Sequence, residues 1–266
     1  MQVRTLPASA GWAWLREGLA LLRRQAFAFT ALVILYSMAL MVLANLPLVG
    51  LPLAALLVPF GTLGITAAGR DAQRNVMPLP SLLIEGFKGP QRNALLRLGL
   101  VHAGLILLMV VITTLFARDE LANWKVVEGQ VDAASVAGNV PWDAIAVMAL
   151  VYMPILMLTW FAPQLVAWHR QPVGKAMFFS LFACWRNKWP FLVLGLVLGA
   201  LVLAVSWLTS MVLSLLGTSP ALGSMLLAPI ALVLTSIAYS TQYPIYHSVL
   251  EPRPEVPPPE TMPEAD

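Results

Sequence analysis

Six long apolar runs constrain the fold of this chain more than any other feature of its sequence. Crossing a hydrocarbon core about 30 Å thick takes roughly 20 mostly apolar residues in a helix. In a bilayer the backbone polar groups must be satisfied internally, and for single runs of this length only a helix does so. The runs that meet the requirement are Ala26–Leu46, Leu51–Gly69, Leu95–Ala117, Ala144–Trp168, Pro190–Leu215 and Gly223–Tyr246. They predict an all-α, polytopic membrane bundle of six transmembrane helices.

The composition excludes a soluble domain. Charged residues make up 11% of the chain and hydrophobic residues 59%, whereas a typical soluble domain is about 25% charged. The net charge of +3 comes from 16 basic and 13 acidic side chains that are segregated along the sequence, so no nucleic-acid partner is indicated. A single cysteine, Cys184, excludes an intrachain disulfide and the usual zinc clusters.

Lysine and arginine are concentrated in alternate connections between the apolar runs, and this pattern predicts the orientation of the protein in the membrane. Basic residues precede the first run, follow the second and follow the fourth. The turns Pro47–Gly50 and Gly217–Leu222 carry no charge, and the loop Arg118–Asp143 is mainly acidic. By the positive-inside rule the basic connections face the cytoplasm. Both termini are then cytoplasmic, and the protein is a multi-pass membrane protein.

The chain divides into three parts. Residues 1–25 form a cytoplasmic amphipathic N-terminal segment, and residues 26–250 form the six-helix transmembrane domain. Residues 251–266, EPRPEVPPPETMPEAD, are rich in proline and glutamate. That composition predicts a disordered cytoplasmic tail, which we interpret as a solvated end rather than a docking segment.

A degenerate pattern recurs three times and predicts three hairpin repeats. In each copy an arginine is followed by an amide residue and then by an apolar run, and a small residue lies six positions before the arginine. The three copies are Gly18, Arg24 and Gln25; Gly86, Arg92 and Asn93; and Ser180, Arg186 and Asn187. The repeating unit is a short amphipathic cytoplasmic helix followed by a hairpin of two spans.

The clearest copy of the amphipathic helix, residues 175–189, has two contrasting faces. Its aromatic stripe comprises Phe178, Leu181, Phe182, Trp185 and Trp189. Its small face comprises Ala176, Ser180, Ala183 and Asn187. We expect the stripe to lie in the membrane interface and the small face to pack against a neighbouring helix. The opposite arrangement, with the aromatic stripe in the protein core, stays open.

The run WFAPQLVAWHRQPVGKAMFFSLFACWRNKWPF resembles the signature region of a family of uncharacterised proteobacterial six-span inner-membrane proteins. The residues that carry the match are Phe161, Ala162, Pro163, Ala176, Met177, Ser180, Ala183, Cys184, Asn187, Pro190 and Phe191. The region is similar, more distantly, to the membrane domain of some glycerophosphodiester phosphodiesterases, whose soluble domain has no counterpart in this sequence. The resemblance implies the architecture and a location in the bacterial cell inner membrane, and it implies no activity.

Motifs of catalysis are missing from the sequence. It contains no HExxH, GxSxG or P-loop, and no span has an Asp, Glu or Lys in its interior. His102 is the one deep ionisable candidate, and a lone histidine on an apolar helix is more often hydrogen-bonded than catalytic. We therefore predict a non-enzymatic protein with no catalytic, cofactor-binding or metal-binding residues. Met38, Met41, Met109 and His102 are interpreted as packing residues rather than copper ligands.

A dense polar segment in the last run, TSIAYSTQYPIYH, gives the candidate site. Polar groups this dense in a membrane need partners, and the end of the fourth run lies at the same depth. The residues assigned to a cytoplasmic-side lipid or ligand pocket are Gln164, His169, Arg170, Arg186, Tyr239, Gln242, Tyr243 and His247. The arginines suit an anionic head group. In the alternative interpretation these groups satisfy one another and the tyrosines anchor the helix at the interface.

Two functions are consistent with these patterns. In the first, the protein handles a lipid or small molecule at the cytoplasmic-side pocket. In the alternative, it is a non-catalytic membrane scaffold or assembly factor that binds other membrane proteins through its tail and amphipathic helices. Membrane lipids are expected partners in both, and neither fixes an oligomeric state.

Overall fold

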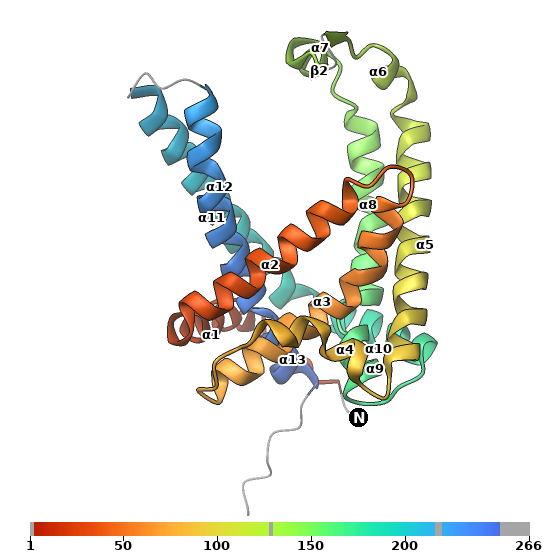
Figure 1. Cartoon of the computed structure of the whole chain (residues 1–266), viewed down its shortest axis with the longest axis vertical. Coiled ribbons are helices and arrows are strands. Elements are labelled where there is room, and N and C mark those ends of the chain that lie inside the picture. Colours follow the sequence, from red (N-terminus) through yellow and green to blue (C-terminus); the bar gives the residue numbers. More distant parts are fainter. Residues whose placement is uncertain (1–2, 128–129, 216–219, 251–266) are drawn as a thin grey trace, which may run out of the picture.

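The computed structural model describes residues 3–127, 130–215 and 220–250, and these residues are almost entirely helical (Figure 1). The predicted tail lies outside them. The shorter helices are α1 (Ala10–Arg24), α4 (Glu85–Lys88), α6 (Arg118–Ala122), α7 (Ala133–Gly138), α9 (Ala162–Ala167), α10 (Val173–Arg186), α13 (Gln242–Leu250) and the 3-10 helix η1 (Pro80–Ile84). The longer helices are α2 (Ala26–Ala44), α3 (Gly50–Gln73), α5 (Arg92–Phe116), α8 (Trp142–Thr159), α11 (Lys188–Leu215) and α12 (Pro220–Ser240).

Five segments of the described chain are long and apolar enough to cross a membrane. They are α2, α3, α5, the α8–α9 segment and α11. They coincide, within a few residues, with the first five predicted spans. The sixth predicted run, Gly223–Tyr246, corresponds to α12 and the start of α13, and it is interrupted at Thr241. The side chains of α12 before residue 229 lie outside the described set.

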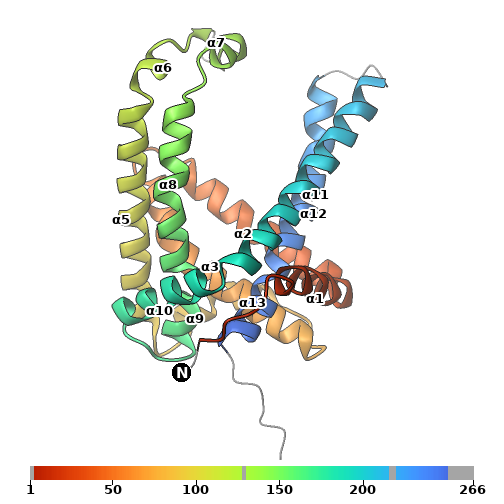
Figure 2. The same cartoon turned by 180° about the vertical axis from the view of Figure 1, so that it is seen from behind.

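The long helices form pairs that diverge from a common base. Figures 1 and 2 show α5 beside α8 and α11 beside α12, with α2 crossing between the two pairs. The base comprises α1, η1, α4, α9, α10 and α13, and we call it the base layer. The helix α3 contacts α2, α5, α9 and α13. It therefore connects the pairs to one another and to the base layer.

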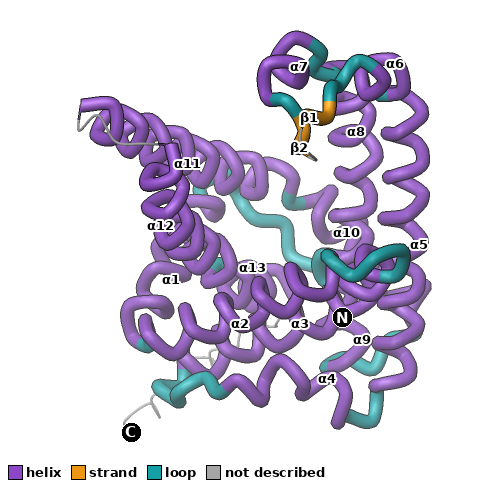
Figure 3. The backbone as a smooth tube through the Cα atoms, turned by 45° about the horizontal axis from the view of Figure 1, so that its top comes forward, coloured by secondary structure: helices purple, strands orange, loops and turns teal. Residues whose placement is uncertain are grey.

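The connection between α5 and α8 contains the only strands of the described residues. The strands β1 (Val126–Val127) and β2 (Gln130–Val131) pair antiparallel, with Val126 opposite Val131 (Figure 3). The helices α6 and α7 flank this ribbon. The ribbon lies at the end of the α5–α8 pair that is remote from the base layer.

A break divides the fourth predicted span into α8 and α9. Pro163 lies in the first turn of α9, where its missing N–H and fixed φ are tolerated at a helix start but not in a helix interior. Ser180 of α10 satisfies the backbone groups that the break exposes. Its Oγ accepts a hydrogen bond from the Phe161 N–H at 2.9 Å and donates one to the Met157 carbonyl at 2.7 Å. The break is therefore buried without losing its hydrogen bonds.

The small residues of the three sequence copies each lie against the second long helix of a neighbouring pair. A Cβ atom added to Gly18 would lie 2.9 Å from Ser240 Oγ, and one added to Gly86 would lie 2.9 Å from the Phe60 ring. Ser180, the third, contacts the α8–α9 break. Close packing against a neighbouring helix, through backbone atoms at Gly18 and through side chains at Gly86, leaves little room for larger residues at these two positions.

The second copy departs from the predicted helix. In place of one amphipathic helix the chain forms the 3-10 helix η1 and the single-turn α4. Pro80 begins this segment, and Gly89 and Pro90 follow it. Proline lacks a backbone N–H donor, and glycine favours the end of a helix. A continuous helix therefore cannot extend to α5.

The two faces of α10 have opposite environments. Ala176, Ser180, Ala183 and Asn187, the residues of the predicted packing face, are all buried. The aromatic side chains on the other face are exposed, with Phe178 62% and Trp185 61% accessible. Cations lie over these rings, since Lys188 Nζ is 4.9 Å from the Trp185 centroid and the Arg186 guanidinium is 5.4 Å from that of Phe182.

The N-terminal segment is held against α13 and the residue between α10 and α11. Asn187 accepts a hydrogen bond from the Leu6 N–H and donates to the Arg4 carbonyl, each at 2.9 Å. The Arg4 N–H donates to the Val249 carbonyl at 3.1 Å. Residues 4–6 are therefore fixed between α13 and the junction of α10 with α11.

An aromatic cluster, buried at Trp14 and Phe161 and partly buried at Phe191 and Trp160, lies where α1 meets α11 and the α8–α9 break. The Trp14 ring of α1 lies 5.2 Å from Phe191 of α11, centroid to centroid. Phe191 also contacts Trp160, 5.3 Å away, and Phe161, 6.2 Å away. The Trp14 Nε1 donates a hydrogen bond to Ser248 Oγ of α13 at 2.7 Å. Trp14 thus connects α1 to α11 and α13.

Candidate functional site

A cavity of about 460 Å³ lies where the helix pairs meet above the base layer. We call it the central cavity. Its lining comes from α2, α3, α5, α8, α9, α12 and α13, together with Trp160 at the α8–α9 break. All three predicted hairpins therefore contribute to one space.

The lining of the central cavity combines aliphatic walls with uncharged polar groups. Side chains that supply apolar surface include Leu40, Val58, Ile155 and Leu156. Those that supply hydrogen-bonding groups include Tyr36, Thr62, His102, Tyr239 and Gln242. None of the described lining residues is Asp, Glu, Lys or Arg. The cavity therefore presents donors and acceptors without a fixed charge.

His102 is the one described lining residue with a buried side-chain nitrogen or oxygen that has no hydrogen-bond partner. It lies on α5, is 7% exposed, and its Nδ1 is buried without a hydrogen-bond partner. Native proteins rarely leave a buried polar atom unpaired, and each such atom calls for an explanation. An isolated charge is costly at this depth. The imidazole is therefore best suited to its neutral form, with one nitrogen as donor and the other as acceptor.

Two tyrosines from different hairpins meet at the cavity. The Tyr36 ring of α2 and the Tyr239 ring of α12 make an edge contact, with centroids 5.9 Å apart and planes at 76°. Tyr36 lies so close to Gly61 of α3 that any Cβ atom at that position would overlap its ring. The absence of a side chain at Gly61 therefore makes room for the Tyr36 ring against α3.

A buried polar junction lies next to the cavity and joins α3, α9 and α13. The Thr66 hydroxyl accepts a hydrogen bond from Gln164 Nε2 at 2.8 Å and lies 3.3 Å from Gln242 Oε1. It also donates to the Thr62 carbonyl at 2.8 Å. The Gln164 Oε1 is buried without a partner. Because Thr62 and Gln242 also line the cavity, the junction forms part of its boundary.

The structure brings together only part of the predicted pocket. Tyr239 and Gln242 line the central cavity, and Gln164 reaches it indirectly through Thr66. Tyr243 and His247 line a second, smaller cavity of about 180 Å³ beside α1. The eight predicted residues are therefore divided between separate environments.

The predicted cationic residues lie elsewhere. Arg170 is exposed, and Arg186 is exposed over Phe182 on the outer face of α10. Neither lines the central cavity. His169 Nε2 lies 2.8 Å from the Tyr246 hydroxyl within the base layer. The sequence grouped these residues by their expected depth in the membrane, and that grouping does not separate residues that point in different directions around the bundle.

Sequence reasoning assigned no role in the pocket to Tyr36, Thr62, Thr66 or His102. A signal existed for the threonines, because Thr62 and Thr66 are four residues apart and share one face of an otherwise apolar helix. Tyr36 is the single tyrosine of the first run. Isolated hydroxyls in a span need partners, and this requirement would have identified both positions.

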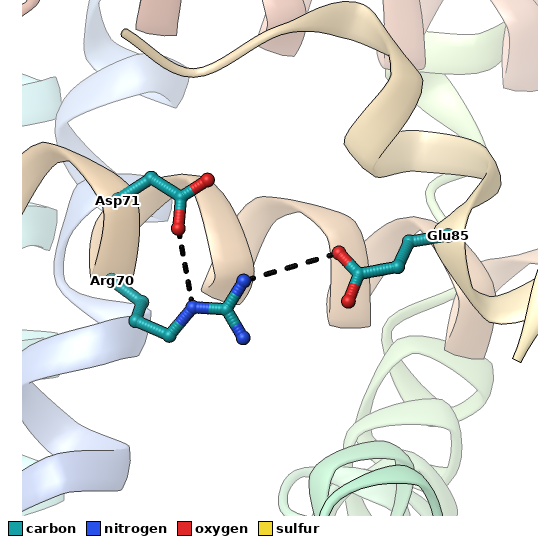
Figure 4. Close-up of polar contacts among 3 residues, drawn as sticks. All are labelled: Arg70, Asp71 and Glu85. Carbon is teal, nitrogen blue, oxygen red and sulfur yellow. Dashed lines mark hydrogen bonds and ion pairs between the residues drawn. The ribbon is translucent and has the colours of Figure 1, made fainter. Parts of the chain in front are cut away.

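Among the residues that the structure describes, the titratable groups outside the spans do not form a second site. Arg70 Nε lies 3.2 Å from Asp71 Oδ1, and Arg70 Nη2 lies 4.0 Å from Glu85 Oε2 (Figure 4). The second pair connects the end of α3 to α4, and both pairs are partly exposed and contribute little to stability. Burial raises the pKa of the Cys184 thiol, which keeps it protonated and unreactive. Within the described chain no group of three or more His, Cys, Asp or Glu could hold a metal ion.

Comparison with known proteins places the chain in a family. No protein-family model and no solved structure matches it. A protein of Burkholderia thailandensis, named a probable inner membrane protein, is 36% identical over 251 residues, covering 92% of this chain and 93% of its own length. Identity of this extent, together with the apolar helices, shows that the chain belongs to the same family of integral inner-membrane proteins.

Proposed function

We propose that this inner-membrane protein holds a lipid or another small molecule in the central cavity. The observation that carries the proposal is a cavity of about 460 Å³ that combines residues of all three predicted hairpins with His102, whose buried Nδ1 has no hydrogen-bond partner. Ligand sites typically measure about 300–1,000 Å³ and combine apolar walls with a few placed polar groups. The proposed role is binding or transfer without covalent chemistry.

The proposed topology has six membrane crossings, with α12 as the sixth. Its 21 residues are long enough to span a hydrocarbon core at 1.5 Å per residue. The three helix pairs are then three hairpin repeats, and the base layer lies at the cytoplasmic surface with both termini. The basic residues that follow α3, those in α10 and those before α2 support this orientation.

Cysteine labelling tests the topology. In a Cys184→Ser background, Asp119→Cys in α6 is expected to react with a membrane-impermeant maleimide added to cells with a permeabilised outer membrane. Val76→Cys, in the connection after α3, is expected to react only after the inner membrane is opened. Both positions are exposed in the structure. The reverse labelling pattern would invert the proposed orientation.

In this topology α10 lies in the cytoplasmic interface. Its exposed rings occupy the acyl boundary, and Lys175, Arg186 and Lys188 lie near lipid phosphates. Anionic membrane lipids are therefore the proposed partners of this face. The distant similarity to the membrane domain of glycerophosphodiester phosphodiesterases stays a prediction, and it adds no activity to the proposal.

Native mass spectrometry tests the cavity. We expect the purified chain to retain a stoichiometric small molecule or lipid when released from mild detergent. Ala238→Phe, which inserts a ring into the cavity lining, should remove it. Ala204→Phe makes the same change at an exposed position of α11 and should leave the bound species in place. Retention by the Ala238→Phe variant, with its folding intact, would refute binding in this cavity.

A scaffold for other membrane proteins is the second candidate. The exposed aromatic stripe of α10 favours it, because contiguous apolar surface also serves protein contacts. Under this function, a membrane protein should co-purify through residues after Glu251 and through Phe178 and Trp185, and it should be unaffected by Ala238→Phe.

A further inference from the structure

The absence of charged side chains from the described lining restricts which ligands the central cavity can bind. The described lining residues include no cation and no anion, and Arg170 and Arg186 lie outside the lining. An ionised phosphate, carboxylate or ammonium group moved into a low-dielectric site without a counter-ion loses several kcal/mol of hydration that nothing repays. The ligand group that enters the cavity is therefore uncharged.

The His102 imidazole restricts the head group further. In either tautomer its buried Nδ1 needs a partner, as acceptor in one form and as donor in the other. A hydroxyl group satisfies both tautomers because it both donates and accepts. A carbonyl or ether oxygen satisfies only the form in which Nδ1 carries the proton. Tyr36, Thr62 and Gln242 also line the cavity and are likewise suited to hydroxyl partners.

The remaining walls suit a hydrocarbon chain. Leu40 of α2, Val58 of α3, and Ile155 and Leu156 of α8 provide aliphatic surface beside the polar groups. A ligand with a polar head and one apolar chain would satisfy both parts of the lining. A purely polar solute would leave the aliphatic surface hydrated, and a pure hydrocarbon would leave the imidazole unpaired.

From these three observations we infer that the central cavity binds a single-chain, uncharged amphiphile whose head carries hydroxyl groups, with His102 as the residue that recognises the head. This inference rests on the proposed function and names the class of its ligand. It differs from the anionic head group that the arginines of the sequence suggested.

The test uses the full chain in phosphatidylcholine nanodiscs and a photoreactive monoolein with a diazirine in its acyl chain. Crosslinked peptides are identified by mass spectrometry. Unlabelled monoolein, oleic acid, 1-oleoyl-lysophosphatidic acid and methyl oleate serve as competitors with the same chain. Because the diazirine lies in the acyl chain, we expect labelling of peptides from α2, α3 and α8, which supply the aliphatic walls. Monoolein should compete about tenfold better than the other three. Methyl oleate lacks the hydroxyl group that would pair with His102, and oleic acid and lysophosphatidic acid bring an uncompensated charge into the cavity.

Two histidine variants make the comparison specific. His102→Leu should lower the labelling about tenfold because it removes the hydrogen-bonding head contact. His247→Leu makes the same change at an exposed residue outside the cavity and should leave labelling unchanged. Thermal midpoints of both variants establish that each is folded. His102→Gln, which restores a donor and an acceptor, should recover part of the labelling.

The outcomes separate the two levels of the proposal. Labelling of the cavity peptides with equal or stronger competition by oleic acid or lysophosphatidic acid would overturn the uncharged head group and leave cavity binding intact. Equal competition by methyl oleate, or unchanged labelling of a folded His102→Leu variant, would overturn the hydroxyl assignment. Failure of every probe to label the cavity peptides would overturn the proposed binding function itself.

Discussion

Replacing Trp14 with alanine is expected to lower the free energy of unfolding by about 3–5 kcal/mol, the usual cost of deleting a large buried aromatic side chain. Trp14 is 1% exposed, its ring packs on Phe191, and its Nε1 donates to Ser248 Oγ. Removal leaves a cavity between α1, α11 and α13. The measurement is the thermal midpoint of the purified protein in one fixed detergent micelle.

Trp12 provides a matched control on the same helix. It is 56% exposed and lies two residues from Trp14, so Trp12→Ala should change the midpoint only slightly. Trp14→Phe keeps most of the ring and loses the hydrogen bond, and it should fall between the two. An equal effect of the Trp12 and Trp14 substitutions would mean that α1 does not dock against the ends of α11 and α13.

Replacing Ser180 with leucine is expected to be the second strongly destabilising change. Overpacking at a fully buried site costs about 1–3 kcal/mol. In addition, the Phe161 N–H and the Met157 carbonyl lose their partner, and an unsatisfied buried polar group costs about 1–3 kcal/mol. Ser180→Ala removes the hydrogen bonds without overpacking, so the difference between the two variants separates these contributions.

Phe182→Ser is the control for the opposite face of α10. Phe182 is 43% exposed, and in detergent its loss should alter the thermal midpoint little. If Phe182→Ser proved more destabilising than Ser180→Leu, the aromatic stripe would be the packed face. The α8–α9 break would then be stabilised by something other than Ser180.

The sequence predicted those parts of the structure that depend on local composition. Five spans could be predicted because the mean hydropathy of a segment depends only on the residues of that segment. The burial of Ser180 and Asn187 follows from the helical period, which places small residues on one face. The interruptions near Phe161 and at Thr241 were not anticipated, because Pro163 and Pro244 lie in runs that remain apolar on average.

The candidate site was harder to predict because hydropathy gives position along the membrane normal and not direction around the bundle. Gln164 and Gln242 both contact Thr66, which is separated from Gln164 by 98 positions and was not assigned to the pocket. Arg186 was grouped with them by depth, yet its side chain lies on the exposed face of α10. Such pairings need the three-dimensional arrangement of the helices.

The hydrogen bond from Trp14 to Ser248 joins residues 234 positions apart, and this separation has a consequence for biosynthesis. At about 5–20 residues per second, a ribosome needs about 10–50 s to add the intervening chain. During that time α1 has been made, whereas α11 is added only in the last part of the interval and α13 only at its end. Its tryptophan-bearing face must then be shielded by lipid, by the insertion machinery or by a chaperone. Completion of the fold therefore waits for the last helices, and a nascent chain stalled before α13 should remain sensitive to proteolysis at α1.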